Sequence, residues 1–224
     1  MARLHLLRVF CGENGSGGNE LAVFLDGHEV PPERRQGVAA DLGLSETVFV
    51  DDAGHGEIRI FTPAAELNFA GHPTVGTAWL LARERSPVPA LNPTAGEVAV
   101  RYSGEETYVA GRAEWGPQYE FRQLGSAAEI DALSAPAGDD EMVVAWAFID
   151  DDAGVVRMRV FPVAIGIAED EATGSAAVQL GALLGRELDI RQGKGSRIRA
   201  RPLGDGRVEI GGHSVLDHSR EHAL

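Results

Sequence analysis

The chain contains the same unusual stretch twice. Residues 69–82 read FAGHPTVGTAWLLA, and residues 170–184 read DEATGSAAVQLGALL. Each begins with small and hydroxyl-bearing residues and continues into a segment without charge. A helix that is apolar on every side has to be buried on every side. The sequence therefore predicts two central helices, each surrounded by other elements.

The segments that precede the two stretches also match. Arg59-Ile60-Phe61 and Arg159-Val160-Phe161 lie 100 positions apart, and both are typical of strands. A repeat at this scale indicates a duplicated structural unit. The predicted unit is a strand, then a polar loop, then a buried helix.

The start of each predicted helix is a candidate binding site. The first N–H groups of a helix lack partners within the helix, and the macrodipole adds partial positive charge there. Gly71–Thr74 and Thr173–Ser175 could together hold an anion such as a carboxylate. The alternative is that these are two capped core helices that bind no ligand.

Length and composition narrow the class of protein. The 224 residues suffice for one large domain or two small lobes. A net charge of −14 argues against nucleic acid and against anionic membrane surfaces as partners. Cys11 is the single cysteine, so no internal disulfide forms and a reducing compartment fits. With no apolar signal segment at the N-terminus, the expected location is the cytoplasm.

Other elements can be predicted in order along the chain. A helix that opens at Pro31-Pro32-Glu33 and runs through Asp41 should end at Gly43. Gly12–Gly18 is interpreted as a connecting loop, because no phosphate-binding pattern follows it. The polar tail from Asp217 is expected to fray. Strands are predicted at 4–10, 19–25, 48–50, 58–62, 96–102, 106–111, 142–149, 155–161, 197–201 and 207–211, with a short helix at 126–132.

Glu46 is the side chain that first suggests acid–base chemistry, and His72, next to a glycine and a proline at the start of the first buried helix, is a further candidate site residue. Glu46 lies between the helix stop at Gly43 and a β-branched strand, flanked by Leu44 and Val48. Desolvation among apolar neighbours raises a carboxyl pKa toward neutrality, which suits a general acid or base. A solvated loop glutamate and an ordinary structural histidine are the alternatives.

Several segments resemble one family in order and spread. They are residues 44–47 (LSET), 61–63 (FTP) with Glu66-Leu67, 69–74 (FAGHPT), and Glu169-Asp170 followed by 172–177 (ATGSAA). Together they resemble the PhzF-like family, phenazine-biosynthesis-type isomerases related in fold to diaminopimelate epimerase. Glu20, Glu171 and Asn68 stand where that family commonly has proline, and the chain is short for the family.

The resemblance implies an α+β fold of two pseudo-symmetric lobes, each a curved mixed sheet wrapped around a central buried helix. The expected lobes are residues 1–103 and 104–224, with the final strand free to return to the first lobe. The resemblance also implies that Glu46 shuttles the proton and that His72, Asp170 and Ser175 line the substrate.

The expected activity is that of an isomerase that moves a proton between carbons of a small carboxylate-bearing metabolite. Related epimerases use two facing thiols, which a chain with only Cys11 cannot provide, so one base, Glu46, is favoured. Gly71, Thr74, Thr173 and Gly174 are the expected substrate-binding positions, and no metal or cofactor is expected. The alternatives are an epimerase of an amino or hydroxy acid and a non-catalytic small-acid binding protein. A homodimer is left open.

Overall fold

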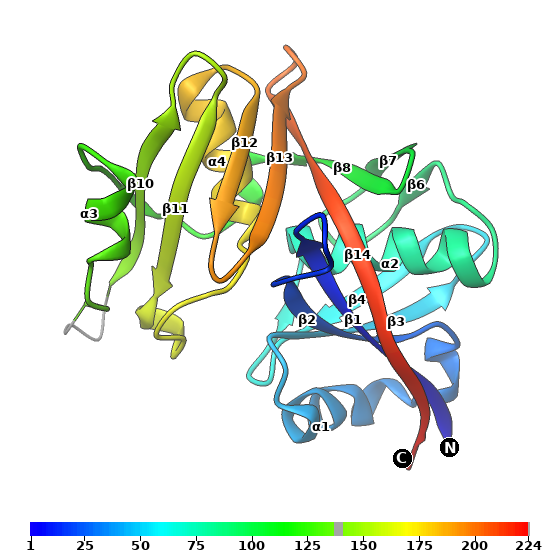
Figure 1. Ribbon diagram of the computed structural model, residues 1–224. Coiled ribbons are helices and arrows are strands. Elements are labelled where there is room, and N and C mark those ends of the chain that lie inside the picture. Colours follow the sequence, from blue (N-terminus) through cyan, green and yellow to red (C-terminus); the bar gives the residue numbers. More distant parts are fainter. Residues whose placement is uncertain (137–140, 224) are drawn as a thin grey trace.

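The computed structural model describes residues 1–136 and 141–223. Figure 1 shows two lobes, each containing one central helix: α2 (Gly71–Glu84) in the first and α4 (Gly174–Leu184) in the second. Within the described residues, the main sheet is mixed and runs continuously through both lobes. The predicted α+β fold class is confirmed. The lobe boundary at residue 103 stays a prediction.

The first lobe is built from five consecutive neighbouring strands. They are β1 (Ala2–Cys11), β2 (Asn19–Phe24), β3 (Glu46–Asp52), β4 (Glu57–Phe61) and β5 (Glu66–Leu67). The 3-10 helix η1 (Gly27–Glu29) and helix α1 (Pro32–Leu42) connect β2 to its parallel neighbour β3. Gly43 ends α1 in the left-handed conformation, as predicted.

The second lobe repeats this order of elements. Helix α3 (Ala127–Asp131) connects β9 (Glu120–Gln123) to the parallel strand β10 (Met142–Asp150), which forms a hairpin with β11 (Val155–Pro162). The Arg59–Glu66 ion pair of the first lobe has its counterpart in Arg159–Glu169. Two short 3-10 helices, η2 (Ala113–Trp115) and η3 (Val163–Ile165), lie outside the repeated strands. The predicted duplication is confirmed.

One long strand connects the lobes. β14 (Arg207–His222) pairs antiparallel with β13 (Ser196–Pro202) and β8 (Glu106–Arg112), and then with β1. The remaining strands are β6 (Ala90–Leu91), β7 (Val98–Ser103) and β12 (Leu188–Gln192). In Figure 1 the last strand brings the C-terminus beside the N-terminus.

The prediction of a frayed tail after Asp217 is wrong. β14 continues to His222, which lies opposite Ala2 in the ladder with β1. The backbone of the tail is satisfied by strand pairing, and Asp217 also binds the Arg8 guanidinium. Its polar side chains are those of a solvent-facing strand, which composition alone does not distinguish from a loose end.

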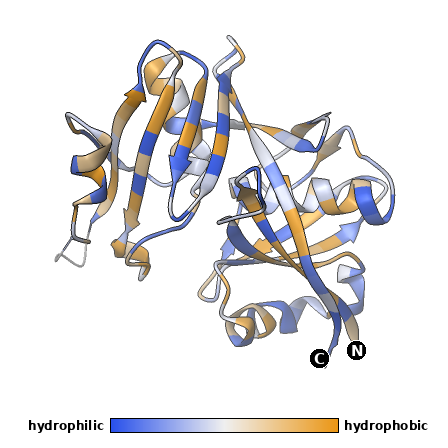
Figure 2. Ribbon diagram, viewed as in Figure 1, coloured by the Kyte–Doolittle hydropathy of each residue, from blue (hydrophilic) through white to orange (hydrophobic). Residues whose placement is uncertain are grey.

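Burial explains why the two central helices carry no charged side chain before the last turn. Ten residues of α2 are buried, and the core formed around α2 and α4 is mostly Val, Leu, Ile and Ala. Figure 2 shows hydrophobic and hydrophilic residues alternating along many strands, as expected where one face of a sheet covers a helix. No helix among the described residues is long and apolar enough to cross a membrane.

Candidate active site

The two central helices meet at their N-termini. A Cβ built on Gly174 would lie 2.8 Å from the Gly71 Cα and 3.0 Å from the His72 backbone nitrogen. A Cβ on Gly71 would meet the Gly174 Cα at 2.9 Å. Glycine is therefore required at both positions, because real Cβ atoms do not approach backbone this closely. The two predicted anion-binding segments lie together, at the junction of the lobes.

Neither helix is capped by a side chain. The N-cap residues, Ala70 and Thr173, have extended backbones and make no side-chain capping bond. First-turn N–H groups in such helices have no intrahelical partner and point along the axis beyond the helix start. The paired termini thus offer two sets of donors, and two positive dipole ends, to one small region.

The hydroxyl and the amide of Thr74 are both bonded within the protein. Its hydroxyl donates to the Ala70 carbonyl at 2.7 Å, and its amide also bonds to that carbonyl. Thr74 is fully buried. In α2 the available first-turn donors are those of Gly71 and His72.

Glu46 and His72 face each other from different elements. Glu46 begins β3 and His72 is in the first turn of α2, and Glu46 Oε2 lies 3.2 Å from His72 Nε2. Both side chains are largely buried. Neither atom has a well-directed hydrogen bond to any described residue. Two such polar atoms in one buried place are expected where a ligand supplies the missing partner.

Burial makes both groups neutral near pH 7. Desolvation raises the pKa of Glu46 to about 8, and the nearby Asp170 carboxylate raises it further. Desolvation lowers the pKa of His72 to about 3, against a smaller opposing effect from the Glu20 backbone. Although the two side chains are close enough for an ion pair, we interpret the contact as one between a carboxylic acid and a neutral imidazole.

Asp170 lies in the other lobe and is held on both carboxylate oxygens. Oδ1 accepts a bond from Asn19 Nδ2 at 2.7 Å, and Oδ2 accepts one from the Thr173 hydroxyl at 2.6 Å. Burial still raises the pKa of Asp170, while these bonds oppose the rise. The amide of Thr173 donates to Gln192 Oε1, so both the amide and the hydroxyl of Thr173 are bonded within the protein.

Ser175, the last predicted site residue, has an aromatic partner that sequence reasoning missed. The Tyr119 hydroxyl lies 3.2 Å from Ser175 Oγ, at the start of α4. Burial raises the pKa of Tyr119 to about 12, and the carboxylates of Asp170 and Glu46 raise it as well. The contact with Ser175 Oγ places the Tyr119 hydroxyl beside the N-terminus of α4. It lies in an irregular segment between η2 and β9, where no sequence pattern marked it.

Asn19 also went unpredicted, although it joins the two lobes. Its amide nitrogen donates to Asp170 and to the Ala172 carbonyl, while its amide oxygen accepts a bond from Ser45 Oγ at 3.2 Å. Ser45 precedes Glu46 in the chain. A signal was available in retrospect, since Asn19 directly follows the glycine loop at the start of β2.

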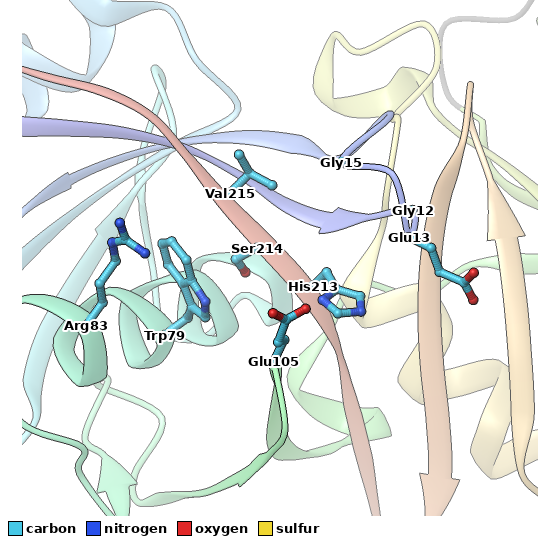
Figure 3. Close-up of a pocket in the computed structure, with 9 residues that line it drawn as sticks. All are labelled: Gly12, Glu13, Gly15, Trp79, Arg83, Glu105, His213, Ser214 and Val215. Carbon is cyan, nitrogen blue, oxygen red and sulfur yellow. The ribbon is translucent and has the colours of Figure 1, made fainter.

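Other features lie apart from this site. A surface hollow of about 370 Å³ is lined by residues that include Trp79, Arg83 and Ser214 (Figure 3), and none of the predicted site side chains lines it. The Cys11 thiol is buried, which raises its pKa. Residues 1–136 and 141–223 contain no group of three or more His, Cys, Asp or Glu side chains placed to hold a metal ion.

The fold is shared with PhzF-family and epimerase-like proteins. Solved structures with the same fold include a PhzF-family phenazine biosynthesis protein from Bacillus anthracis (TM-score 0.83, 18% identity) and a predicted epimerase from Pseudomonas aeruginosa (TM-score 0.77, 25% identity). Both comparisons cover 100% of this chain, and 99% and 100% of the respective structures.

Sequence comparison then identifies the family. The family model described as phenazine biosynthesis-like protein matches residues 8–148. The trans-2,3-dihydro-3-hydroxyanthranilate isomerase of Pseudomonas fluorescens is 33% identical over 79% of this chain and 78% of its own length. The enzyme of that name from Pseudomonas aeruginosa is 32% identical over 88% and 91%. The chain belongs to the PhzF-like family of isomerases.

Proposed function

We propose that this isomerase moves a proton between two carbons of a small carboxylate-bearing metabolite, with Glu46 as the general acid and base and without a metal or organic cofactor. The observation that carries the proposal is the buried Glu46–His72 contact, in which both facing atoms lack a well-directed partner. A substrate placed against Glu46 would supply that partner.

The pKa of Glu46 fits both halves of such a reaction. A carboxyl with a pKa of about 8 is a stronger base than an ordinary glutamate, and it is also an effective proton donor at neutral pH. One group can therefore take a proton from one carbon and return it to another. The neutral His72 ring contributes a fixed hydrogen-bonding partner for the substrate or for Glu46.

The paired helix termini would make the substrate C–H group more acidic. N–H donors held at a substrate carboxylate stabilise the negative charge that develops when a neighbouring carbon loses its proton. The donors of Gly71, His72, Gly174 and Ser175 are suited to this role because they belong to uncapped first turns. Asp170 would orient an amine or hydroxyl of the same substrate.

A reaction with Glu46 as the single base is favoured over one in which Glu46 and Asp170 act as two opposed bases. Both oxygens of Asp170 already accept bonds, from Asn19 and Thr173, whereas Glu46 Oε2 has none. A carboxylate fixed in this way is suited to positioning rather than to collecting a proton from carbon. This argues for isomerisation over two-base epimerisation.

The first test is the identity of the product. Trans-2,3-dihydro-3-hydroxyanthranilate is the first compound to try, because relatives of this chain are named for its isomerisation. Product structure by NMR should show a moved double bond or hydrogen with an unchanged molecular formula. A product with unchanged connectivity and one inverted centre would favour the epimerase. Saturable binding of an acid without any product, across a panel of unsaturated, amino and hydroxy acids, would favour the binding protein.

A further inference from the structure

Two turns from different lobes contact each other beside the site. One is the glycine loop, residues 12–18, between β1 and β2. The other is the turn between β12 and β13, residues 193–195, which leads into Ser196 at the start of β13. A Cβ on Gly17 would lie 2.6 Å from the Ser196 backbone nitrogen, and a Cβ on Gly12 would lie 2.6 Å from the Gly195 carbonyl oxygen. The glycines thus permit backbone-to-backbone packing that no side chain would allow.

Ser196 makes the polar connection between the two turns. Its hydroxyl oxygen accepts a bond from the Gly18 N–H at 2.8 Å and donates to Glu171 Oε1 at 2.8 Å. Ser196 is 1% exposed, so the bond from Gly18 is buried, and the bond to Glu171 is partly buried. The same Glu171 oxygen accepts a bond from the Lys194 N–H at 2.7 Å.

Glu171 is covalently next to Asp170, and Gly18 is next to Asn19. Asn19 in turn donates to Asp170 at 2.7 Å. The contacts therefore close a ring, from Asp170 to Asn19, Gly18, Ser196, Glu171 and back to Asp170. The ring crosses from one lobe to the other twice, once through Asn19 and once through Ser196.

An ion pair next to the ring also connects the two lobes. Glu13 of the glycine loop pairs with Arg197, which follows Ser196 on β13. Figure 3 shows Glu13 extending from the loop toward the strands of the second lobe. Because Glu13 is well exposed, this pair contributes little stability of its own.

We propose that Glu171 is a positioning residue, which acts through Ser196 to hold the Asp170 segment and the Asn19 segment in one fixed arrangement across the lobes. Its carboxylate accepts hydrogen bonds from Ser196 and Lys194 rather than from the Glu46–His72 pair. The Glu171 carboxylate restrains the backbone around Asp170. It also restrains the glycine loop that precedes Asn19, whose side chain bonds to Asp170. This inference rests on the proposed function only for its effect on turnover.

A merely structural role would lower stability without a selective effect on the reaction. A positioning role predicts that loss of the Glu171 carboxylate lets Asp170 and Asn19 shift relative to Glu46. Misplacement of a group by about 1 Å can reduce rates up to about 100-fold. The two roles therefore differ in kcat at a temperature where the variant is fully folded.

The experiment compares Glu171→Ala, Ser196→Ala and the double variant with Glu187→Ala, a change at an exposed glutamate. We expect kcat to fall about ten-fold in each single variant and no further in the double, because both break the same ring. Glu171→Gln keeps one acceptor oxygen and should recover part of the loss. Multiplied losses in the double variant, or equal kcat in Glu171→Ala and Glu187→Ala, would overturn the proposal.

A second measurement needs no substrate. Amide hydrogen exchange of a peptide covering residues 12–19 should quicken in Glu171→Ala and Ser196→Ala, since the Gly18 N–H loses its restrained acceptor, and should stay unchanged in Glu187→Ala. An exchange rate that is the same in all variants and in the wild type would contradict the proposed ring of contacts. If the wild type turns over no compound, the proposed function fails, and the exchange data still decide whether Glu171 joins the two turns.

Discussion

The Cα atoms of Gly71 and Gly174 lie so close that neither residue has room for a Cβ. The built Cβ of Gly174 falls 2.8 Å from the Gly71 Cα. These glycines open the two central helices of the repeat, and their contact brings two uncapped helix termini to one point. The site is thus a product of the duplication, formed where the two copies meet.

Gly174→Ala should separate the helix termini and abolish most of the activity. The added methyl clashes with backbone rather than with a movable side chain, so the lobes must shift, at a cost of about 1–3 kcal/mol. We expect kcat/KM to fall at least about ten-fold. The matched control is Gly37→Ala in α1, where a Cβ meets nothing within 4 Å and activity should be unchanged. Steady-state kinetics and thermal unfolding of both variants check this.

Glu46→Gln should stabilise the protein at alkaline pH. The pKa of Glu46 is about 8 in the folded state against an ordinary 4.5, so the folded protein holds this proton more tightly than the unfolded chain. The resulting stabilisation is complete below pH 4.5, declines as pH rises, and is lost above pH 8. Removing the charge should therefore raise the free energy of unfolding at pH 9 by about 1–3 kcal/mol, with little change near pH 4. Urea unfolding at the two pH values measures the difference; equal shifts at both would contradict the buried carboxyl.

The rate should rise with pH over the range in which Glu46 ionises. If the ionised carboxylate removes the substrate proton, kcat/KM of the free enzyme follows the fraction of Glu46 that is deprotonated. It should increase about ten-fold per pH unit below the pKa and level off above pH 8. A profile that is flat from pH 6 to 8 would show that another group, or another step, limits the reaction.

Replacing two tyrosines in turn should distinguish a residue of the active site from a residue that only stabilises the fold. Tyr119→Phe removes the hydroxyl that contacts Ser175, so kcat/KM should fall several-fold while stability changes by about 1 kcal/mol or less. Tyr102→Phe removes bonds to the Val88 amide and to the Ala78 carbonyl, far along α2 from the site. That variant should lose stability and keep its activity. The opposite pattern, measured by kinetics and thermal unfolding together, would place Tyr119 outside the site.

The repeated segments carried most of what the sequence could predict. Two uncharged apolar stretches, each preceded by a strand and a loop of small residues, were enough to predict two buried helices whose N-termini lie together. That an anion binds there stays a prediction. The family resemblance assigned Glu46, His72, Asp170 and Ser175, and the structure brings all four to the junction of the lobes. Their catalytic roles stay predictions.

The missed residues share a physical reason. Asn19 and Tyr119 are single polar side chains in loops or at a strand start, and their partners lie 151 and 56 positions away in the sequence. The local sequence pattern indicates which face of a helix or strand is buried, but it does not indicate which loops of the two lobes contact each other. The polar tail was misjudged for the same reason, since its partner strand β1 is at the other end of the chain.

The central claim is that Glu46 exchanges a proton with a carbon of the substrate. The most direct measurement is proton NMR of a substrate in deuterated water with wild type, Glu46→Gln, and the control Glu97→Gln, which changes an exposed glutamate. We predict that deuterium enters one carbon position with wild type and with Glu97→Gln, and that Glu46→Gln incorporates none. Deuterium incorporation by Glu46→Gln at the wild-type rate would contradict the account.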